Sequence, residues 1–82
     1  SKWWGDFSVY RVYNTRGLMH SKKLIELLKS DGWVLNRSRG SHHIFIHNTK
    51  SGHICIPHPK KDLGLGLVEK ILKQADIKRG LK

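Results

Sequence analysis

The chain has 82 residues, with 16 Lys and Arg against 6 Asp and Glu, and its formal net charge is +10. A chain of this length forms one domain with a modest core, and its single cysteine excludes an internal disulfide. No apolar run is long enough to span a bilayer and no export signal precedes the first helix pattern. We therefore expect a reduced, cytoplasmic protein without a membrane partner.

The basic excess favours a partner that carries phosphate, because a positively charged surface attracts polyanions. The lysines are spread over every expected element, whereas a membrane-surface helix would gather them on one face. The simpler alternative is that the charge only keeps the domain soluble, although the imbalance exceeds what solubility needs. Charge alone does not distinguish RNA from DNA.

Residues 1–18 differ in composition from the rest of the chain, because they hold most of its aromatic residues. The only methionine, Met19, stands just before the first clear helical pattern. We interpret residues 1–18 as an N-terminal extension, either upstream or added sequence, and residues 19–82 as the domain proper. The alternative is a genuine extra strand over residues 7–13 that covers a sheet edge.

A helix is predicted over residues 21–31, with Ser21 as its N-cap and Gly32 as the glycine that follows its end. Leucine and isoleucine repeat there at helical spacing, with lysine and glutamate between them. Strands are predicted over residues 33–37, 42–47 and 53–56, separated by turns over 38–41 and 48–52. Connections this short predict an antiparallel meander.

A basic loop over residues 60–64 leads to a second predicted helix over 65–75, whose apolar residues form one stripe. The tail over 78–82 is expected to fray. The order α-β-β-β-α predicts an α+β fold, in which a three-stranded antiparallel sheet carries both helices on one face. Cys55 stands between two isoleucines, and this setting predicts a buried thiol.

Six histidines raise the question of a metal site, and the pattern argues against one. His43 and His47 share a strand face but are four residues apart, about 13 Å at the rise of a strand. One cysteine is too few for a typical structural zinc site, and the carboxylates are too scattered for a magnesium nuclease. We expect no metal and no small-molecule cofactor.

For cleavage of RNA without a metal, the protein does not have to supply a nucleophile, since the ribose 2′-hydroxyl next to the scissile phosphate is a built-in one. A general base, a general acid and cationic side chains suffice, and histidine can supply the first two. His42 and His43 follow Gly40-Ser41 at a strand start, where a phosphate can approach the backbone. The other histidines are interpreted as solvated strand ends (His47, His53), a helix start (His20) and a loop hydrogen bond (His58).

Four pieces of the chain occur in an order that is typical of one family: Leu28-Lys29-Ser30-Asp31-Gly32-Trp33, Gly40-Ser41-His42-His43-Ile44-Phe45, Ile56-Pro57-His58-Pro59 and Ile71-Leu72-Lys73-Gln74-Ala75. Residues 20–77 resemble the HicA toxins of bacterial and archaeal HicAB toxin–antitoxin modules. The resemblance implies a double-stranded-RNA-binding-domain-like fold and a ribosome-independent mRNA interferase neutralised by a partner antitoxin, HicB. The family often has glycine where this chain has Asp76, which affects only the cap of the last helix.

The resemblance also implies which histidine matters. The histidine of the family's Gly-Ser-His motif is essential for toxicity and matches His42, but some members carry it one place later, at the position of His43. Strand alternation groups His42 with Ile44 and Ile46 and favours exposure of His43. The motif favours His42, which we take, or else His43, as general base or acid.

We therefore expect an endoribonuclease toxin that binds mRNA. The candidate RNA contacts, with their cationic members flanking the strands at both ends of the sheet, are Arg37, Arg39, Gly40, Ser41, Lys60 and Lys61. The alternative from another class is a non-catalytic RNA-binding module of the same fold, which would not require two histidines after the turn. A DNA-binding regulator would need a helix-turn-helix, and neither predicted helix has such a partner.

Overall fold

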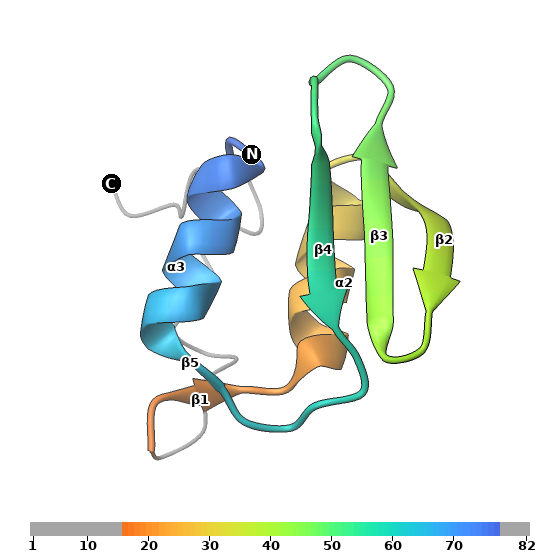
Figure 1. The fold of residues 1–82 in the computed structure, drawn as a ribbon. Helices are drawn as coiled ribbons and strands as arrows, with labels where there is room; N and C mark the ends of the chain where they lie inside the picture. The colour runs from red at the N-terminus through yellow and green to blue at the C-terminus, as the bar shows by residue number, and fades with distance from the viewer. Residues whose placement is uncertain (1–15, 78–82) are drawn as a thin grey trace.

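The computed structural model describes residues 16–77, which fold into a sheet backed by helices (Figure 1). In chain order the elements are β1 (Leu18–Met19), α2 (Ser21–Ser30), β2 (Trp33–Arg39), β3 (His42–His47), β4 (His53–Pro57), β5 (Leu63–Gly64) and α3 (Leu65–Gln74). Strands β2, β3 and β4 form an antiparallel sheet in that order. The predicted α+β fold with α-β-β-β-α order is therefore confirmed.

The short strands β1 and β5 form a separate antiparallel ladder, in which Leu18 pairs with Gly64 and Met19 with Leu63. Met19 and Leu63 are both buried in the core. Leu18 therefore takes part in the fold, although the sequence grouped it with the N-terminal extension. The strand expected over residues 7–13 and the tail over 78–82 lie outside the described residues.

Helix α2 is capped by His20 rather than by Ser21, so the predicted N-cap is wrong. His20 has an extended backbone, and its Nδ1 accepts a hydrogen bond from the backbone N–H of Lys22 at 3.0 Å. Ser21 is the first helical residue and is fully buried. At the other end Gly32 has a positive φ of 104°, which confirms its expected place after the helix.

A single hydrophobic core lies between the helices and one face of the sheet. Its helical members are Leu24, Ile25 and Leu28 from α2 and Val68, Ile71 and Leu72 from α3; its sheet members are Trp33, Phe45, Ile54 and Ile56. The apolar stripe predicted for each helix is therefore the stripe that packs. Neither described helix has the length and apolar character that a membrane crossing requires.

The structure shows which face of the sheet is buried. The exposure expected for His43 and the burial expected for Cys55 are both wrong. Phe45 is only 1% exposed, so its face is the one that the helices cover, and His43 lies on that face half-buried. His42 and Ile46 lie on the opposite, open face and are exposed, as is Cys55. The alternation itself was right, but the assignment of the buried side was not.

The turn between β3 and β4 is tied to the ends of both helices. Lys50 Nζ donates to Oδ2 of Asp31 at 2.6 Å and to the carbonyls of Ala75 and Asp76 at 3.0 and 2.9 Å. Asp31 is the C-cap of α2, and Ala75 is the C-cap of α3. One ammonium group therefore joins this turn to the two helices.

His47 is a structural residue, not a solvated strand end. Its side chain is 9% exposed, and its Nδ1 accepts hydrogen bonds from the backbone N–H groups of Thr49 and Lys50 at 3.0 and 3.1 Å. Nε2 therefore carries the proton and donates to the carbonyl oxygen of Asp31 at 2.7 Å. Both ring nitrogens are used to hold the turn.

Helix α3 ends at Gln74 with Ala75 as its C-cap, and the next residue, Asp76, has a positive φ of 56°. This is the left-handed conformation in which glycine is favoured and aspartate is tolerated. The residue that departs from the family pattern therefore adopts the backbone conformation that the usual glycine would adopt.

Candidate active site

Three histidines from distant parts of the chain converge at one end of the sheet. His43 is in β3, His58 follows β4 and His20 precedes α2. The rings of His43 and His58 meet edge to face with their centroids 5.0 Å apart, and the centroids of His20 and His58 are 6.4 Å apart. We call these three residues the histidine cluster.

Backbone pairing explains why the cluster forms. The antiparallel register places the start of β3 beside the end of β4, with His42 opposite Pro57. The N–H of His58 then donates to the carbonyl of Ser41 at 2.7 Å. The N–H of Ser21 donates to the carbonyl of Lys60 at 2.7 Å, which draws the loop after β4 onto the start of α2.

The buried hydroxyl of Ser21 fixes the ring of His58. Ser21 Oγ lies 2.6 Å from Nδ1 of His58 in a hydrogen bond, and it also accepts the backbone N–H of Lys60 at 2.9 Å. Ser21 is fully buried, so the hydroxyl that makes both contacts is itself shielded from water. One nitrogen of His58 is thus held in place, and Nε2 is left for other partners.

The surroundings of His58 disfavour its protonated form. Burial lowers the pKa of His58 below 6.5, and the positive charges of His43, His20 and Lys22 lower this pKa further. His58 is therefore neutral at neutral pH. A histidine in this state, set among other histidines, is typical of a functional site.

His43 contributes a second polar ring to the same place. It is half-buried, and its Nδ1 is buried without a hydrogen-bond partner among residues 16–77. An unpaired polar atom of this kind costs about 1–3 kcal/mol and calls for an explanation, such as a role in chemistry. Because Nδ1 is buried, Nε2 is the nitrogen of His43 that can exchange a proton with a substrate.

His42 lies on the other face of the sheet, although it is the neighbour of His43 in sequence. It is exposed, and its partner across the β2–β3 ladder is Arg39, which is also exposed. Arg37 is paired with Ile44 on this same open face. The two histidines named from the sequence therefore belong to two different surfaces.

The basic candidates lie at one end of the sheet, not at both ends as expected. The strand β2 ends where β3 begins, so Arg39 stands opposite His42, and the loop with Lys60 and Lys61 follows the end of β4 at the same place. The antiparallel order of the three strands brings these segments together. All these side chains are exposed, and Lys60 Nζ lies 3.2 Å from the carboxylate of Asp62.

The turn between β2 and β3 is built by Gly40 and Ser41. Gly40 has a positive φ of 58°, and a Cβ at this position would meet no atom within 4 Å. Both residues are exposed, so the backbone beside the cationic side chains is open to a ligand. The six RNA contacts expected from the sequence thus share one end of the sheet.

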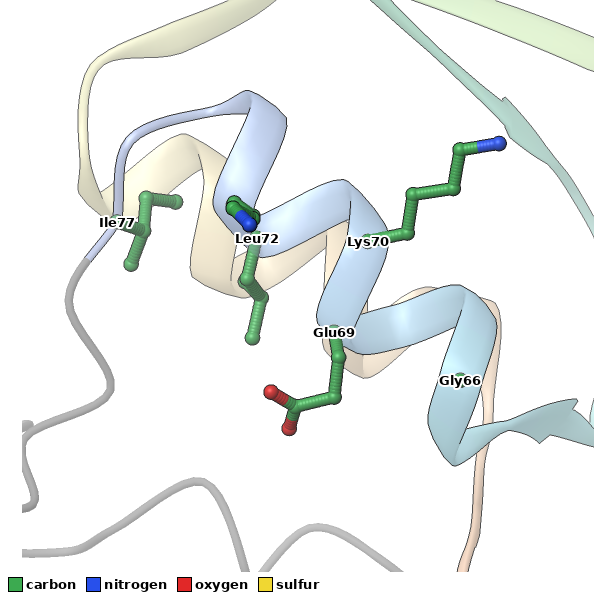
Figure 2. A pocket seen from close by; sticks show the side chains of 6 residues that line it. Gly66, Glu69, Lys70, Leu72 and Ile77 are labelled. Carbon is green, nitrogen blue, oxygen red and sulfur yellow. The ribbon is translucent and has the colours of Figure 1, made fainter.

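Within residues 16–77, histidine, cysteine and carboxylate side chains form no group of three that could hold a metal ion. A separate hollow lies on α3, lined by Gly66, Glu69, Lys70, Leu72, Lys73 and Ile77 (Figure 2). In Figure 2 the side chains of Glu69 and Lys70 point in different directions, and none of the lining residues belongs to the histidine cluster. The cluster is therefore the better candidate for chemistry.

The sequence identified His43 but missed two of its companions, Ser21 and His58. They are separated from His43 by 22 and 15 positions, so no short motif links them. Their only local signals are a serine at a helix start and a histidine between two prolines. Both signals have simpler structural explanations when the chain is read alone.

The model of one protein family, described as HicA toxin of bacterial toxin-antitoxin, matches residues 21–77. This segment is well over half of the chain and runs from the start of α2 past the end of α3, and the chain belongs to the HicA toxin family. No curated protein sequence matches it. The resemblance seen in the sequence is thus confirmed: the chain is the toxin of a toxin–antitoxin pair, with an antitoxin as its partner.

Proposed function

We propose that this HicA-family toxin is a metal-independent endoribonuclease that cleaves mRNA and arrests growth until a HicB-type antitoxin neutralises it. The observation that carries the proposal is the histidine cluster at the basic end of the sheet. General acid–base chemistry needs two titratable groups at one place, and the rings of His43 and His58 are in contact there.

The proposed reaction uses the RNA's own nucleophile. The 2′-hydroxyl oxygen attacks the adjacent phosphorus while a base removes its proton, and the bond from phosphorus to the 5′ oxygen breaks while an acid protonates that oxygen. The products are a 2′,3′-cyclic phosphate and a 5′-hydroxyl. DNA lacks the 2′-hydroxyl, so the same site leaves DNA intact.

Of the two histidines named from the sequence, the geometry supports His43 as the reacting one. His43 touches a second histidine, whereas His42 lies on the open face with Arg39 as its cross-strand partner. The family motif is the argument for His42. We assign to His42 a contact with the RNA chain beside the reacting phosphate.

Binding of the phosphate chain is assigned to the basic end of the sheet. Arg37 and Arg39 reach it from β2, and Lys60 and Lys61 from the loop after β4. Gly40 and Ser41 form a turn between the arginines and the lysines, where the backbone is exposed to a ligand. Cations at the reacting phosphate also stabilise the charge that develops on it in the transition state.

The antitoxin is expected to be acidic and to cover this same end of the sheet. A protein of net charge +10 attracts an acidic partner over a distance, and this attraction speeds association. Docking over the β2–β3 turn would exclude RNA by occlusion, without a change of shape in the toxin. Copurification of the neighbouring gene product and rescue of growth by it are the expected results.

The proposal is tested with the purified full chain, single-stranded RNA and excess EDTA. We expect RNA to be cleaved and a DNA strand of the same sequence to remain intact. Loss of cleavage on chelation would exclude the metal-free mechanism. Tight binding of RNA without cleavage would instead favour the second candidate, a non-catalytic RNA-binding module of this fold.

A further inference from the structure

The ring of His58 is held at one nitrogen and free at the other. Nδ1 is bonded to Ser21 Oγ at 2.6 Å, so Nε2 is the only nitrogen left to exchange a proton with a substrate. A hydroxyl both donates and accepts, so this one contact suits the neutral and the protonated ring alike. The ring can therefore change its charge without leaving its position.

The ring of His43 packs edge to face against the ring of His58. Its Nδ1 is buried, and its centroid lies 5.0 Å from that of His58 at an interplanar angle of 85°. Both residues are half-buried, so the pair borders solvent at the end of the sheet where the cationic side chains lie. The two rings therefore place two titratable groups side by side at this end of the sheet.

We infer that His58 is the general base of the reaction, that His43 is the general acid, and that Ser21 is the positioning residue of His58. This inference rests on the proposed endoribonuclease function and names the residue that complements His43. A base oriented by a third group is the arrangement that makes proton transfer efficient in other enzymes.

The proton balance of the step follows from these roles. As the 2′ oxygen bonds to phosphorus, its proton passes to Nε2 of His58. As the bond from phosphorus to the 5′ oxygen breaks, that oxygen takes a proton from Nε2 of His43. The step leaves His58 protonated and His43 neutral, and exchange with solvent restores both before the next turnover.

The electrostatics of the cluster agree with the role of His58 as base. Burial and the charges of His43, His20 and Lys22 lower the pKa of His58, so the ring is unprotonated at neutral pH. A base has to be in this form before the reaction begins. The backbone of Lys60 also faces the site, but its ammonium is directed to Asp62.

The first test removes His58 and uses His53 as the matched control. His53 is an exposed histidine at the opposite end of the sheet, where it is paired with Ile46. We expect His58→Ala to lower kcat about 10²-fold or more and to remove the acid limb of the pH profile, and His53→Ala to match the wild type. Unchanged binding of a 2′-O-methyl RNA, which lacks the nucleophile, and an unchanged circular dichroism spectrum verify the fold.

The second test separates base from acid with an RNA whose scissile 5′ oxygen is replaced by sulfur. Thiolate is a good leaving group and departs without protonation, because thiols have a pKa of about 8.5. His43→Ala should cleave this substrate at close to the wild-type rate, and His58→Ala should stay defective. Rescue of His58→Ala instead of His43→Ala would overturn the assignment of roles.

The role of Ser21 is tested by a double-mutant cycle. If Ser21 acts through His58, Ser21→Ala lowers kcat in the wild type and has no further effect in His58→Ala. An equal decrease in both backgrounds would show a general structural role and overturn the positioning role.

Failure of the inference and failure of the proposed function are distinguishable. If the wild type cleaves RNA and His58→Ala cleaves it equally fast with the same pH profile, the inference is wrong and the endoribonuclease function stands. If the wild type cleaves no RNA, the proposed function is wrong, and the inference falls with it.

Discussion

Replacement of Lys50 should destabilise the domain without changing its chemistry. The substitution Lys50→Met keeps the apolar stem but removes three hydrogen bonds from Nζ, to Asp31 and to the carbonyls of Ala75 and Asp76. The side chain is 26% exposed, so solvent weakens these charged contacts. We expect a loss of about 2 kcal/mol, less than three fully buried charged hydrogen bonds would give.

The measurement is the free energy of unfolding from denaturant titration, together with the melting temperature. For a domain of this size, 2 kcal/mol corresponds to a fall in Tm of about 8–16 °C. Lys61→Met is the matched control, because Lys61 is an exposed lysine in a loop. Equal stability of the two variants would refute the conclusion that Lys50 joins the turn to the helices.

Activity provides an internal check on the same variant. Lys50 is in the turn after β3, and His43 of the histidine cluster is near the start of that strand, about 13 Å from the strand's end at the rise of a strand. At temperatures well below its Tm, Lys50→Met should cleave RNA at the wild-type rate. A lower kcat in the folded variant would contradict the separation of these two regions.

Three further predictions concern binding, backbone and exposure. Replacement of Lys60 and Lys61 by alanine should lower the slope of log affinity against log salt by about 0.7 for each phosphate that these lysines neutralise, and an unchanged slope would remove both from the RNA interface. Gly32→Ala should destabilise the domain by about 2 kcal/mol in a thermal melt, because its φ is 104° and a Cβ would lie 2.8 Å from Nε2 of His47. Cys55 should react with a maleimide in the native protein as fast as a free cysteine does, whereas labelling only on unfolding would place the thiol in the core.

Periodicity predicted the main elements because each is long enough to show a pattern. The helix expected over residues 21–31 and the three strands agree with α2, β2, β3 and β4 to within two residues at each end. The strands β1 and β5 have two residues each, and two residues carry no alternation. Their pairing depends on tertiary contacts of Met19 and Leu63 that no local pattern contains.

The sequence predicted which residues share a sheet face but not which face is buried. Both faces of β3 carry apolar residues, with Ile44 and Ile46 on one and Phe45 on the other. The neighbouring strand decides the matter, because Ile54 and Ile56 lie on the side of Phe45 and are buried with it. The exposure expected for His43 was wrong for this reason. The burial expected for Cys55 was wrong because the isoleucines on either side of it lie on the buried face and leave Cys55 on the open one.

Only half of the residues in the candidate site could be predicted from the sequence. The turn before β3 and its histidines drew attention through their local chemistry, whereas His58 and Ser21 join the site only through strand register and the loop after β4. A histidine between prolines has no distinguishing pattern until its partners are known. Long-range pairing therefore added the second half of the site.

If histidines cleave RNA through its own 2′-hydroxyl, the chemical ends of the products differ from those that water would leave. RNA is incubated with the purified chain in excess EDTA, and the new termini are identified by mass spectrometry. The mechanism predicts a 2′,3′-cyclic phosphate on one fragment and a 5′-hydroxyl on the other, with neither formed by His43→Ala. Fragments that carry a 5′-phosphate and a 3′-hydroxyl would contradict it, because water would then be the nucleophile.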